Sequence, residues 1–160
     1  MAEQKTNVMR LLDQKKIKYT AREYPHSDAP VDGVTAAALM GQDPARVFTT
    51  LVARGASKKI YVFDIPAAAE LDLKKAAKAV GEKSIAMVHV SEITTLTGYV
   101  RGGCSPVGMK KQYPTVFHET AAGQDTVIVS AGRIGFQVEL APADLIGLVR
   151  GAYADIITEE

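Results

Sequence analysis

Two strand-forming runs separated by a short connection constrain the fold of this chain more than any other feature. The first run covers residues 46–54 and the second covers residues 59–65, and both are rich in β-branched and aromatic side chains. The four-residue connection contains Gly55, which is typical of a β-hairpin, and Pro66 follows directly after the second run. The sequence therefore predicts an antiparallel pair of strands here.

The remaining elements are short and alternate between the two kinds of periodicity. Helices are predicted at residues 7–16, 34–40, 71–80 and 143–149, with a single helical turn at 92–96; further strands are predicted at 17–24, 86–90, 115–118, 126–130 and 135–140. Strands outnumber helices, and they come in antiparallel pairs more often than in βαβ units. This pattern predicts the α+β class, with a mixed, mostly antiparallel, barrel-like sheet and flanking helices.

Composition limits the organisation of the chain and its possible partners. A length of 160 residues with 47% hydrophobic content predicts one domain over residues 1–160. The formal net charge of +1 means that any nucleic-acid contact must come from a local basic patch. The single cysteine excludes an internal disulfide, and no Cys/His spacing resembles a zinc site. Without a signal segment or a long apolar run, we expect a cytoplasmic protein that uses no membrane, metal or cofactor.

A glycine-dense loop at residues 97–111 is the strongest candidate for a ligand-binding segment. Gly98, Gly102, Gly103 and Gly108 allow positive φ angles and a close approach of the backbone to a ligand. Successive N–H groups in such a loop can hold an anionic or carbonyl oxygen, and Ser105 adds a hydroxyl next to Pro106. A Gly-Gly pair before Ser-Pro is also the composition of a plain turn, which stays open as the alternative. Cys104, which has no histidine beside it in the sequence, is interpreted as a small hydrophobic residue.

Several other polar residues have a structural interpretation beside a functional one. Tyr24 and His26 lie where the strand 17–24 ends, a place typical of a core-edge tyrosine and a solvated histidine. His89 and His118 are interpreted as strand-face or packing residues. In the helix 71–80 the residues predicted to face inward are Leu73, Ala76, Ala77 and Val80. Its lysines, Lys74, Lys75 and Lys78, form either a solvated face or a contact for a phosphate backbone.

Five motifs in one order resemble the YbaK/EbsC family of free-standing aminoacyl-tRNA deacylases, which are related to the editing domain of bacterial prolyl-tRNA synthetases. They are Tyr-x-His at 24–26, Val-Phe-x-Thr-Leu at 47–51, Leu-Asp-Leu-Lys-Lys-Ala-Ala-Lys at 71–78, the glycine loop at 97–111, and Val-Ser-x-Gly-x-x-Gly-x-x-x-Glu-Leu at 129–140. The resemblance spans nearly the whole chain. It implies a cytoplasmic α+β domain without metal that removes a wrong amino acid, typically cysteine from tRNA(Pro), with prolyl-tRNA synthetase as a possible partner.

The same resemblance implies roles for individual residues. Catalytic positions would be Thr49, Gly102, Gly103 and Ser105; substrate-binding positions would be Tyr24, His26, Pro106, Gly108, Ser130, Gly132 and Gln137. With a net charge near zero, we expect tRNA to be bound through few phosphate contacts, made by Lys74, Lys75, Lys78, Lys110, Lys111 and Arg133. An aminoacyl ester is already activated, so holding its carbonyl and stabilising the oxyanion can suffice. In members that clear cysteine, the resemblance implies that the substrate thiol attacks the ester carbonyl.

The chain departs from the family pattern at two positions. The family strand usually carries a lysine where this sequence has Thr49, and Ile134 stands where a second basic residue is common. A hydroxyl cannot supply the charge of a lysine. Three explanations remain open: another substrate, a lysine supplied from elsewhere such as Lys110 or Lys111, or a binding module without turnover. A regulatory or synthetase-interacting protein is a further alternative.

Overall fold

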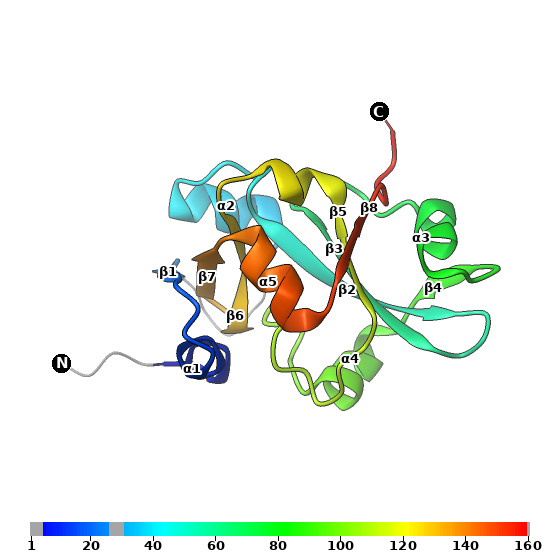
Figure 1. Ribbon diagram of the computed structural model, residues 1–160, viewed down its shortest axis with the longest axis horizontal. Coiled ribbons are helices and arrows are strands. Elements are labelled where there is room, and N and C mark those ends of the chain that lie inside the picture. Colours follow the sequence, from blue (N-terminus) through cyan, green and yellow to red (C-terminus); the bar gives the residue numbers. More distant parts are fainter. Residues whose placement is uncertain (1–4, 26–30, 160) are drawn as a thin grey trace.

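The computed structural model describes residues 5–25 and 31–159, and it places five α-helices and eight strands in this part of the chain (Figure 1). The helices are α1 (Asn7–Gln14), α2 (Gly33–Met40), α3 (Leu73–Val80), α4 (Val90–Thr97) and α5 (Pro142–Val149), with a 3₁₀ turn at Glu119–Gly123. The strands are β1 (Thr20–Glu23), β2 (Phe48–Gly55), β3 (Ile60–Pro66), β4 (Ile85–Met87), β5 (Thr115–His118), β6 (Val127–Arg133), β7 (Phe136–Leu140) and β8 (Ala152–Ala154).

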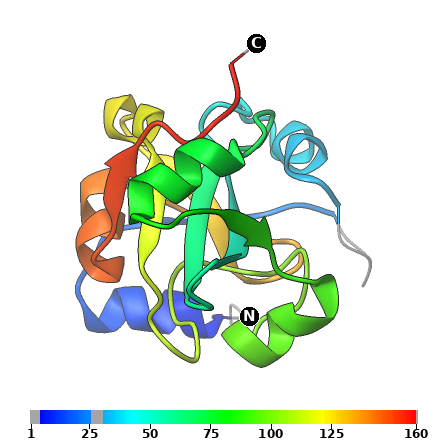
Figure 2. The same ribbon diagram turned by 90° about the vertical axis from the view of Figure 1, so that its right-hand side faces the viewer.

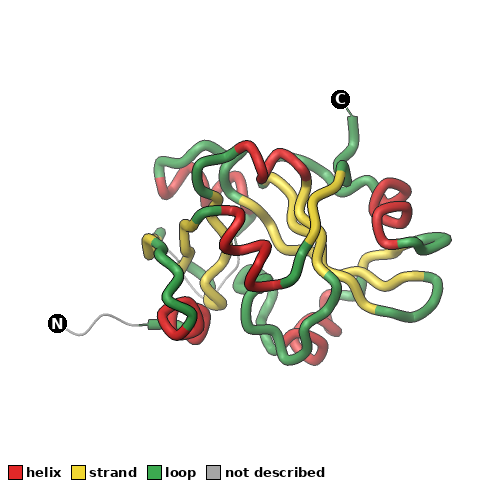
Figure 3. The backbone as a smooth tube through the Cα atoms, in the orientation of Figure 1, coloured by secondary structure: helices red, strands yellow, loops and turns green. Residues whose placement is uncertain are grey.

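The strands form two sheets, which lie side by side in Figure 3. The smaller sheet has the order β1-β7-β6 and is antiparallel throughout. The larger has the order β4-β2-β3-β5-β8; β2 pairs antiparallel with β3 and β4, whereas β5 pairs parallel with β3 and β8. The predicted α+β class and mixed sheet are confirmed. The barrel is not closed, because a single bridge between Val47 and Ile128 joins the β2 side of the larger sheet to β6.

Local capping interactions explain where the helices begin and end. The Thr6 hydroxyl accepts the Met9 N–H in front of α1, and the Asp32 carboxylate accepts the Thr35 N–H in front of α2. Gly41 and Gly81 end α2 and α3 in the left-handed conformation, at φ 68° and 74°. These caps are visible in the sequence, and the predicted positions of these three helices are accordingly close to the observed ones.

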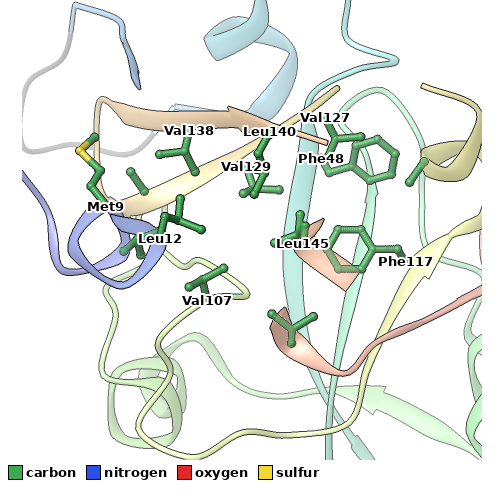
Figure 4. Close-up of a cluster of buried hydrophobic side chains, with 14 residues drawn as sticks. Met9, Leu12, Phe48, Val107, Phe117, Val127, Val129, Val138, Leu140 and Leu145 are labelled. Atoms are coloured by element: carbon green, nitrogen blue, oxygen red, sulfur yellow. The ribbon is translucent and has the colours of Figure 1, made fainter. Parts of the chain in front are cut away.

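The main hydrophobic core lies between the two sheets and is covered by α1 and α5. Figure 4 shows Val129 and Val138 from the smaller sheet near Leu12 of α1, with Phe48 and Phe117 of the larger sheet beside them. The two phenylalanine rings have centroids 6.1 Å apart. This shared core holds the two sheets in a fixed relation, although only one backbone bridge joins them in the described part of the chain.

A second core lies on the other face of the larger sheet, where α3 covers it (Figure 2). Tyr61, Phe63 and Ile65 point from β3 toward Ala76 and Ala77 of the helix. The prediction that Leu73 also faces inward is wrong: its side chain is 43% exposed. Leu73 is the first residue of α3, and its side chain extends past the edge of the sheet into a surface cleft described below.

The segment before the glycine loop differs from its prediction. β4 ends at Met87, and His89 is the N-cap of α4 rather than a strand residue. The His89 Nδ1 accepts the Ser91 N–H at 3.2 Å, while the Glu92 carboxylate accepts the His89 N–H at 3.0 Å. This reciprocal capping box makes α4 eight residues long instead of one turn.

His118 is a packing residue, as predicted. It is buried at the end of β5, and its Nδ1 accepts the Ile156 N–H at 3.2 Å. Burial is the main cause that lowers its pKa. The sequence analysis did not predict β8, which follows α5 and completes the larger sheet next to β5. In the described residues there is no helix with the length and apolar character that crossing a membrane requires.

Candidate active site

A small pocket opens at the place where the two sheets separate. Among the described residues, the backbone next to β2 pairs with β6 only at the Val47–Ile128 bridge, and the same edge of β2 pairs with β4 only from Ala53 onward. Within the described chain, no strand pairs with this edge between those two points. The pocket lies along this unpaired stretch, and its volume is about 90 Å³.

The pocket walls come from both sheets and from the glycine loop. The polar lining residues are Tyr24, Thr49, Thr50, Cys104, Ser130 and Gln137, and the other lining residues are Val31, Gly33, Ala36, Val47, Phe48 and Gly102. Ser130 and Gln137 are cross-strand partners in β6 and β7. Among these described lining residues there is no lysine, arginine or carboxylate. The pocket therefore offers neutral hydrogen-bonding groups to whatever binds there.

The small pocket opens into a larger cleft of about 830 Å³. Six residues line both spaces: Val31, Gly33, Thr49, Thr50, Gly102 and Cys104. The outer walls of the cleft are largely apolar, and three of their side chains, Leu73, Met87 and Val90, are among the exposed large hydrophobic residues. Arg101 is the one cationic residue among the described residues that line it. The arrangement suits a ligand with a small polar end and a larger, flatter body.

Thr49 lies at the junction of the pocket and the cleft, and a glycine of α2 packs closely against it. A Cβ atom added to Gly33 would lie 2.8 Å from the Thr49 Oγ1 and also 2.8 Å from the Ala67 Cβ. Only a residue without a side chain lets the first turn of α2 come this close to β2. The beginning of α2 is thus part of the site, which the sequence analysis did not predict.

The glycine loop turns one side toward the pocket and the other toward the core. Gly102 has φ 86° and lines both spaces, and Cys104 lies next to it in the wall. Gly103 faces the other way: its N–H donates to the Val100 carbonyl at 3.0 Å, and an added Cβ would lie 3.1 Å from the Ile134 nitrogen. The predicted catalytic position of Gly103 is therefore a contact with the β6–β7 turn.

Four further residues predicted for the site lie outside both spaces. Ser105 is fully buried, and its hydroxyl accepts the Val107 N–H at 3.2 Å. Pro106 is buried beside it. Gly108 and Gly132, at φ 78° and 96°, both pack against Tyr99, Gly108 next to its hydroxyl and Gly132 next to its ring. The structure thus brings Tyr24, Thr49, Gly102, Ser130 and Gln137 together but not these four, and His26 lies outside the described residues.

The Ser130 hydroxyl can donate a hydrogen bond to a ligand in the pocket. Its Oγ accepts the Gly132 N–H at 3.1 Å, and this contact leaves the hydroxyl proton available to another acceptor. Tyr24 is buried, with 2% of its surface exposed, so its ring closes the end of the pocket. Together these uncharged side chains can orient a carbonyl or amine group of a ligand through hydrogen bonds.

Cys104 is unsuited to act as a nucleophile. Burial raises the pKa of its thiol to about 12, with a further contribution from the nearby Asp64 carboxyl. A thiol with this pKa is neutral at pH 7, and the thiolate is the nucleophilic form. The interpretation of Cys104 as a small hydrophobic wall residue agrees with this environment.

Asp64 is a buried acidic residue that the sequence analysis missed. It lies on β3 directly opposite Thr50, and the Thr50 hydroxyl donates to its Oδ1 at 2.5 Å. Its Oδ2 is buried without a hydrogen-bond partner among the described residues. Burial raises the pKa of the carboxyl to about 8. The signal available in the sequence was a lone aspartate inside the apolar run 60–65.

The six cationic residues predicted to contact tRNA line neither space. Lys74 and Lys78 are exposed on α3, and Lys110 and Lys111 are exposed after the glycine loop. Lys75 forms a salt bridge and a hydrogen bond within the protein: its Nζ lies 3.0 Å from the Asp155 Oδ2 and donates to the Ile157 carbonyl at 2.9 Å. The Arg133 guanidinium lies 5.1 Å from the centre of the Phe136 ring. In the described residues there is no cluster of three His, Cys, Asp or Glu suited to a metal ion.

Comparison with known proteins identifies the family of this chain. The family model of the aminoacyl-tRNA editing domain matches residues 29–148, which contain most of the pocket and the whole glycine loop. The chain belongs to the aminoacyl-tRNA editing domain family. An Enterococcus faecalis relative, named as a candidate Cys-tRNA(Pro)/Cys-tRNA(Cys) deacylase, EbsC, is 44% identical over 158 residues, or 99% of this chain and 96% of the relative.

Two solved structures share the fold of this chain. A candidate trans-editing enzyme for prolyl-tRNA synthetase is 26% identical, with a TM-score of 0.81 over 95% of both chains. A hypothetical protein is 21% identical, with a TM-score of 0.84 over 94% of this chain and 99% of its own, and shows the same fold.

Proposed function

We propose that this editing-domain protein is a free-standing deacylase that hydrolyses the ester bond of a mischarged tRNA, with Cys-tRNA(Pro) as its substrate. The observation that carries this proposal is the small neutral pocket opening into the apolar cleft. A volume of about 90 Å³ suits a small aminoacyl group, and about 830 Å³ accommodates the terminal nucleoside. The name of the 44% identical relative supports cysteine as the amino acid.

The residues of the pocket would bind and orient the aminoacyl ester. Ser130 and Gln137 can hold its polar groups, and the backbone at Gly102 lies in the wall near the mouth. Neutral donors placed before the reaction stabilise the negative charge that develops on the carbonyl oxygen. A carboxylate in the wall would oppose that charge, so an uncharged lining favours ester cleavage.

The protein need not supply the nucleophile. With a cysteinyl ester, the substrate sulfur can form a bond to its own carbonyl carbon while the carbon–oxygen bond to the ribose breaks. The thiol proton is transferred to the departing ribose oxygen, and water then opens the cyclic thioester to give free cysteine. The neutral Cys104 thiol, with its pKa of about 12, fits a wall residue in such a reaction.

The tRNA end would lie across the cleft. Apolar walls suit a stacked base, and Arg101 lies where it can approach a phosphate. Exposed lysines beyond the cleft, Lys74, Lys78, Lys110 and Lys111, supply further phosphate contacts. We place this one-domain protein, residues 1–160, in the cytoplasm beside prolyl-tRNA synthetase, whose mischarged product it would clear.

Thr49 supports a second candidate, a tRNA-binding module without turnover. Thr49 lies at the mouth of the pocket, and none of the described residues that line the small pocket carries a positive charge. If transition-state stabilisation in this family depends on a cation, the site would bind the aminoacyl end and leave the ester intact.

Single-turnover assays on a panel of charged tRNAs test the proposal. Purified protein is mixed with Cys-tRNA(Pro), Ala-tRNA(Pro), Cys-tRNA(Cys) and Pro-tRNA(Pro), and release of the amino acid is followed against buffer alone. We expect faster release from the cysteinyl esters than from Pro-tRNA(Pro). Gln137→Leu, which removes a pocket amide at similar volume, serves as the matched variant and should slow the release. Tight binding of every tRNA without release would favour the binding module.

A further inference from the structure

We propose that Asp64 is a positioning residue that decides whether the Thr50 hydroxyl donates a hydrogen bond into the pocket. The inference rests on the deacylase function proposed above. It begins from three observations: Asp64 is fully buried, one of its oxygens contacts Thr50, and the other has no partner among the described residues. Thr50 itself lines both the pocket and the cleft.

The contact between the two side chains can exist in two directions. When the Asp64 carboxyl is ionised it can only accept, so the Thr50 hydroxyl must donate its proton to it. When the carboxyl is neutral, its own O–H can donate to the Thr50 oxygen. The Thr50 proton is then free to turn toward the pocket and donate to a ligand.

The neutral state is the one that suits ester cleavage. The carbonyl oxygen of an ester accepts hydrogen bonds, and it accepts them more strongly as negative charge develops. A donating Thr50 therefore adds stabilisation in the transition state. An ionised Asp64 removes this donor and places a negative charge behind the wall of the pocket.

The surroundings of Asp64 favour the neutral state near pH 7. Burial is the main cause that raises its pKa to about 8, and the hydrogen bond from Thr50 opposes the shift. The titratable group facing it from the loop is Cys104, whose own pKa of about 12 keeps it neutral. Next to Cys104 lies Tyr99, whose pKa burial raises to about 12. On β5, the residue opposite Asp64 is Phe117, and the side chain of Phe117 is uncharged. Among these described groups, Asp64 alone would therefore change its charge between pH 7 and pH 9 and alter the direction of the Thr50 hydrogen bond.

The test compares pH profiles of single-turnover deacylation of Cys-tRNA(Pro), after subtraction of spontaneous hydrolysis. Dividing the wild-type rate by the Asp64→Asn rate at each pH removes the titration of the substrate thiol and amine. With a pKa of about 8, this ratio should fall about tenfold from pH 7 to pH 9, because the neutral fraction falls by that factor. The matched control is Asp144→Asn on the exposed surface of α5. The wild-type rate divided by the Asp144→Asn rate should be the same at every pH.

Substitutions at Thr50 separate its hydroxyl from the charge of Asp64. Thr50→Ser keeps the hydroxyl, so its deacylation rate relative to that of Asp64→Asn should still fall from pH 7 to pH 9. Thr50→Val should be slower at pH 7, and its relative rate should not fall over this range. An alkaline fall that persists in Thr50→Val would overturn the proposal, since the charge would then act without the hydroxyl.

A titration of the folded protein tests the same inference without substrate. In ¹³C-aspartate-labelled protein, one carboxyl resonance should titrate near pH 8 and be absent from Asp64→Asn. Titration of Asp64 in the ordinary acidic range would overturn the inference even if the variants fold poorly. Absence of deacylation on every tRNA would reject the proposed function and this inference with it; an active enzyme with a flat rate ratio would reject this inference alone.

Discussion

The two sides of the glycine loop have different roles although their sequences look alike. Its pocket side consists of Arg101, Gly102 and Cys104, which line the pocket or the cleft. Its core side consists of Gly103, Ser105, Val107 and Gly108, which pack against the β6–β7 turn, α1 and Tyr99. Positive φ occurs on both sides, at Gly102 and at Gly108. Glycine density thus marks where the backbone has an unusual conformation, and only the packing shows whether it faces a ligand or the core.

Tyr99 joins the core side of the loop to the rest of the protein. Its hydroxyl lies next to Gly108 and donates to the Val107 carbonyl, and its ring fills the space that glycine leaves at Gly132. The core side therefore holds the pocket side in position. Substitutions on the two sides should have separable effects, on stability in one case and on catalysis in the other.

Valine at two adjacent glycines should give the largest contrast. Gly102→Val places a branched side chain in the pocket wall and requires a positive φ that costs about 1–2 kcal/mol. We expect deacylation to fall on the order of 100-fold. Gly103→Val pushes against the backbone of Arg133 and Ile134 and should lower the free energy of unfolding by about 1–3 kcal/mol.

Rates normalised to the folded fraction, with urea unfolding of both proteins, check this pair. A normalised rate that is lost in Gly103→Val but retained in Gly102→Val would reverse the assignment of the two sides.

Alanine at two serines should give the next largest contrast. Ser105→Ala removes the acceptor of the buried Val107 N–H, which should cost about 1–3 kcal/mol of stability. Ser130→Ala removes a pocket hydroxyl and should lower the rate about tenfold more than Ser105→Ala does, relative to folded protein. The measurements are thermal unfolding and single-turnover rates at one temperature. Equal normalised rates in the two variants would contradict the placement of Ser130 in the pocket and of Ser105 in the core.

Much of the fold could be predicted because its signals are local. The hairpin of β2 and β3, the caps at Thr6 and Gly81, and the turn before β7 are all contained in short stretches of sequence. The sequence could not show that the strands form two sheets instead of a closed barrel, because the bridge between Val47 and Ile128 and the core shared by both sheets join residues far apart in the chain. β8 is a similar case: three residues become a strand because β5 offers a free edge.

The candidate site was predictable in part, through residues that the family resemblance marks. Tyr24, Thr49 and Gly102 do meet at one pocket. Ser105 and Gly103 do not, because adjacent residues of a tight loop point in opposite directions, which motif matching cannot resolve. Asp64 could not be assigned to the site from the sequence, since its relation to Thr50 depends on the register of β2 against β3.

Lysine at position 49 would add a cation at the mouth of the pocket, where Gly102 of the loop also lies. Thr49 is half-buried at the mouth, so a longer side chain can extend into the open cleft. A charged hydrogen bond contributes about 1 kcal/mol more than a neutral one, which corresponds to about fivefold in rate. We expect Thr49→Lys to deacylate Cys-tRNA(Pro) about fivefold faster than the wild type.

The melting temperature is the control for Thr49→Lys, because Gly33 packs closely against this position. A well-folded variant with unchanged rates on every charged tRNA would show that position 49 takes no part in catalysis.

The smallest effects on tRNA binding should come from the lysines of α3, of which Lys75 has partners within the protein and Lys78 is exposed. Lys75 binds Asp155 and the Ile157 carbonyl, so its charge serves to hold the C-terminal segment against α3. Lys78 is exposed and appears in no hydrogen bond or ion pair described for this chain, which leaves it available to a phosphate. Lys78→Ala should therefore weaken tRNA binding about twofold at low salt and reduce the slope of log Kd against log salt concentration by about one. Lys75→Ala should leave that slope unchanged and instead speed hydrogen exchange in residues 155–158. Titrations at several salt concentrations distinguish the two, and a larger change of slope in Lys75→Ala than in Lys78→Ala would show that the ion pair with Asp155 opens when tRNA binds.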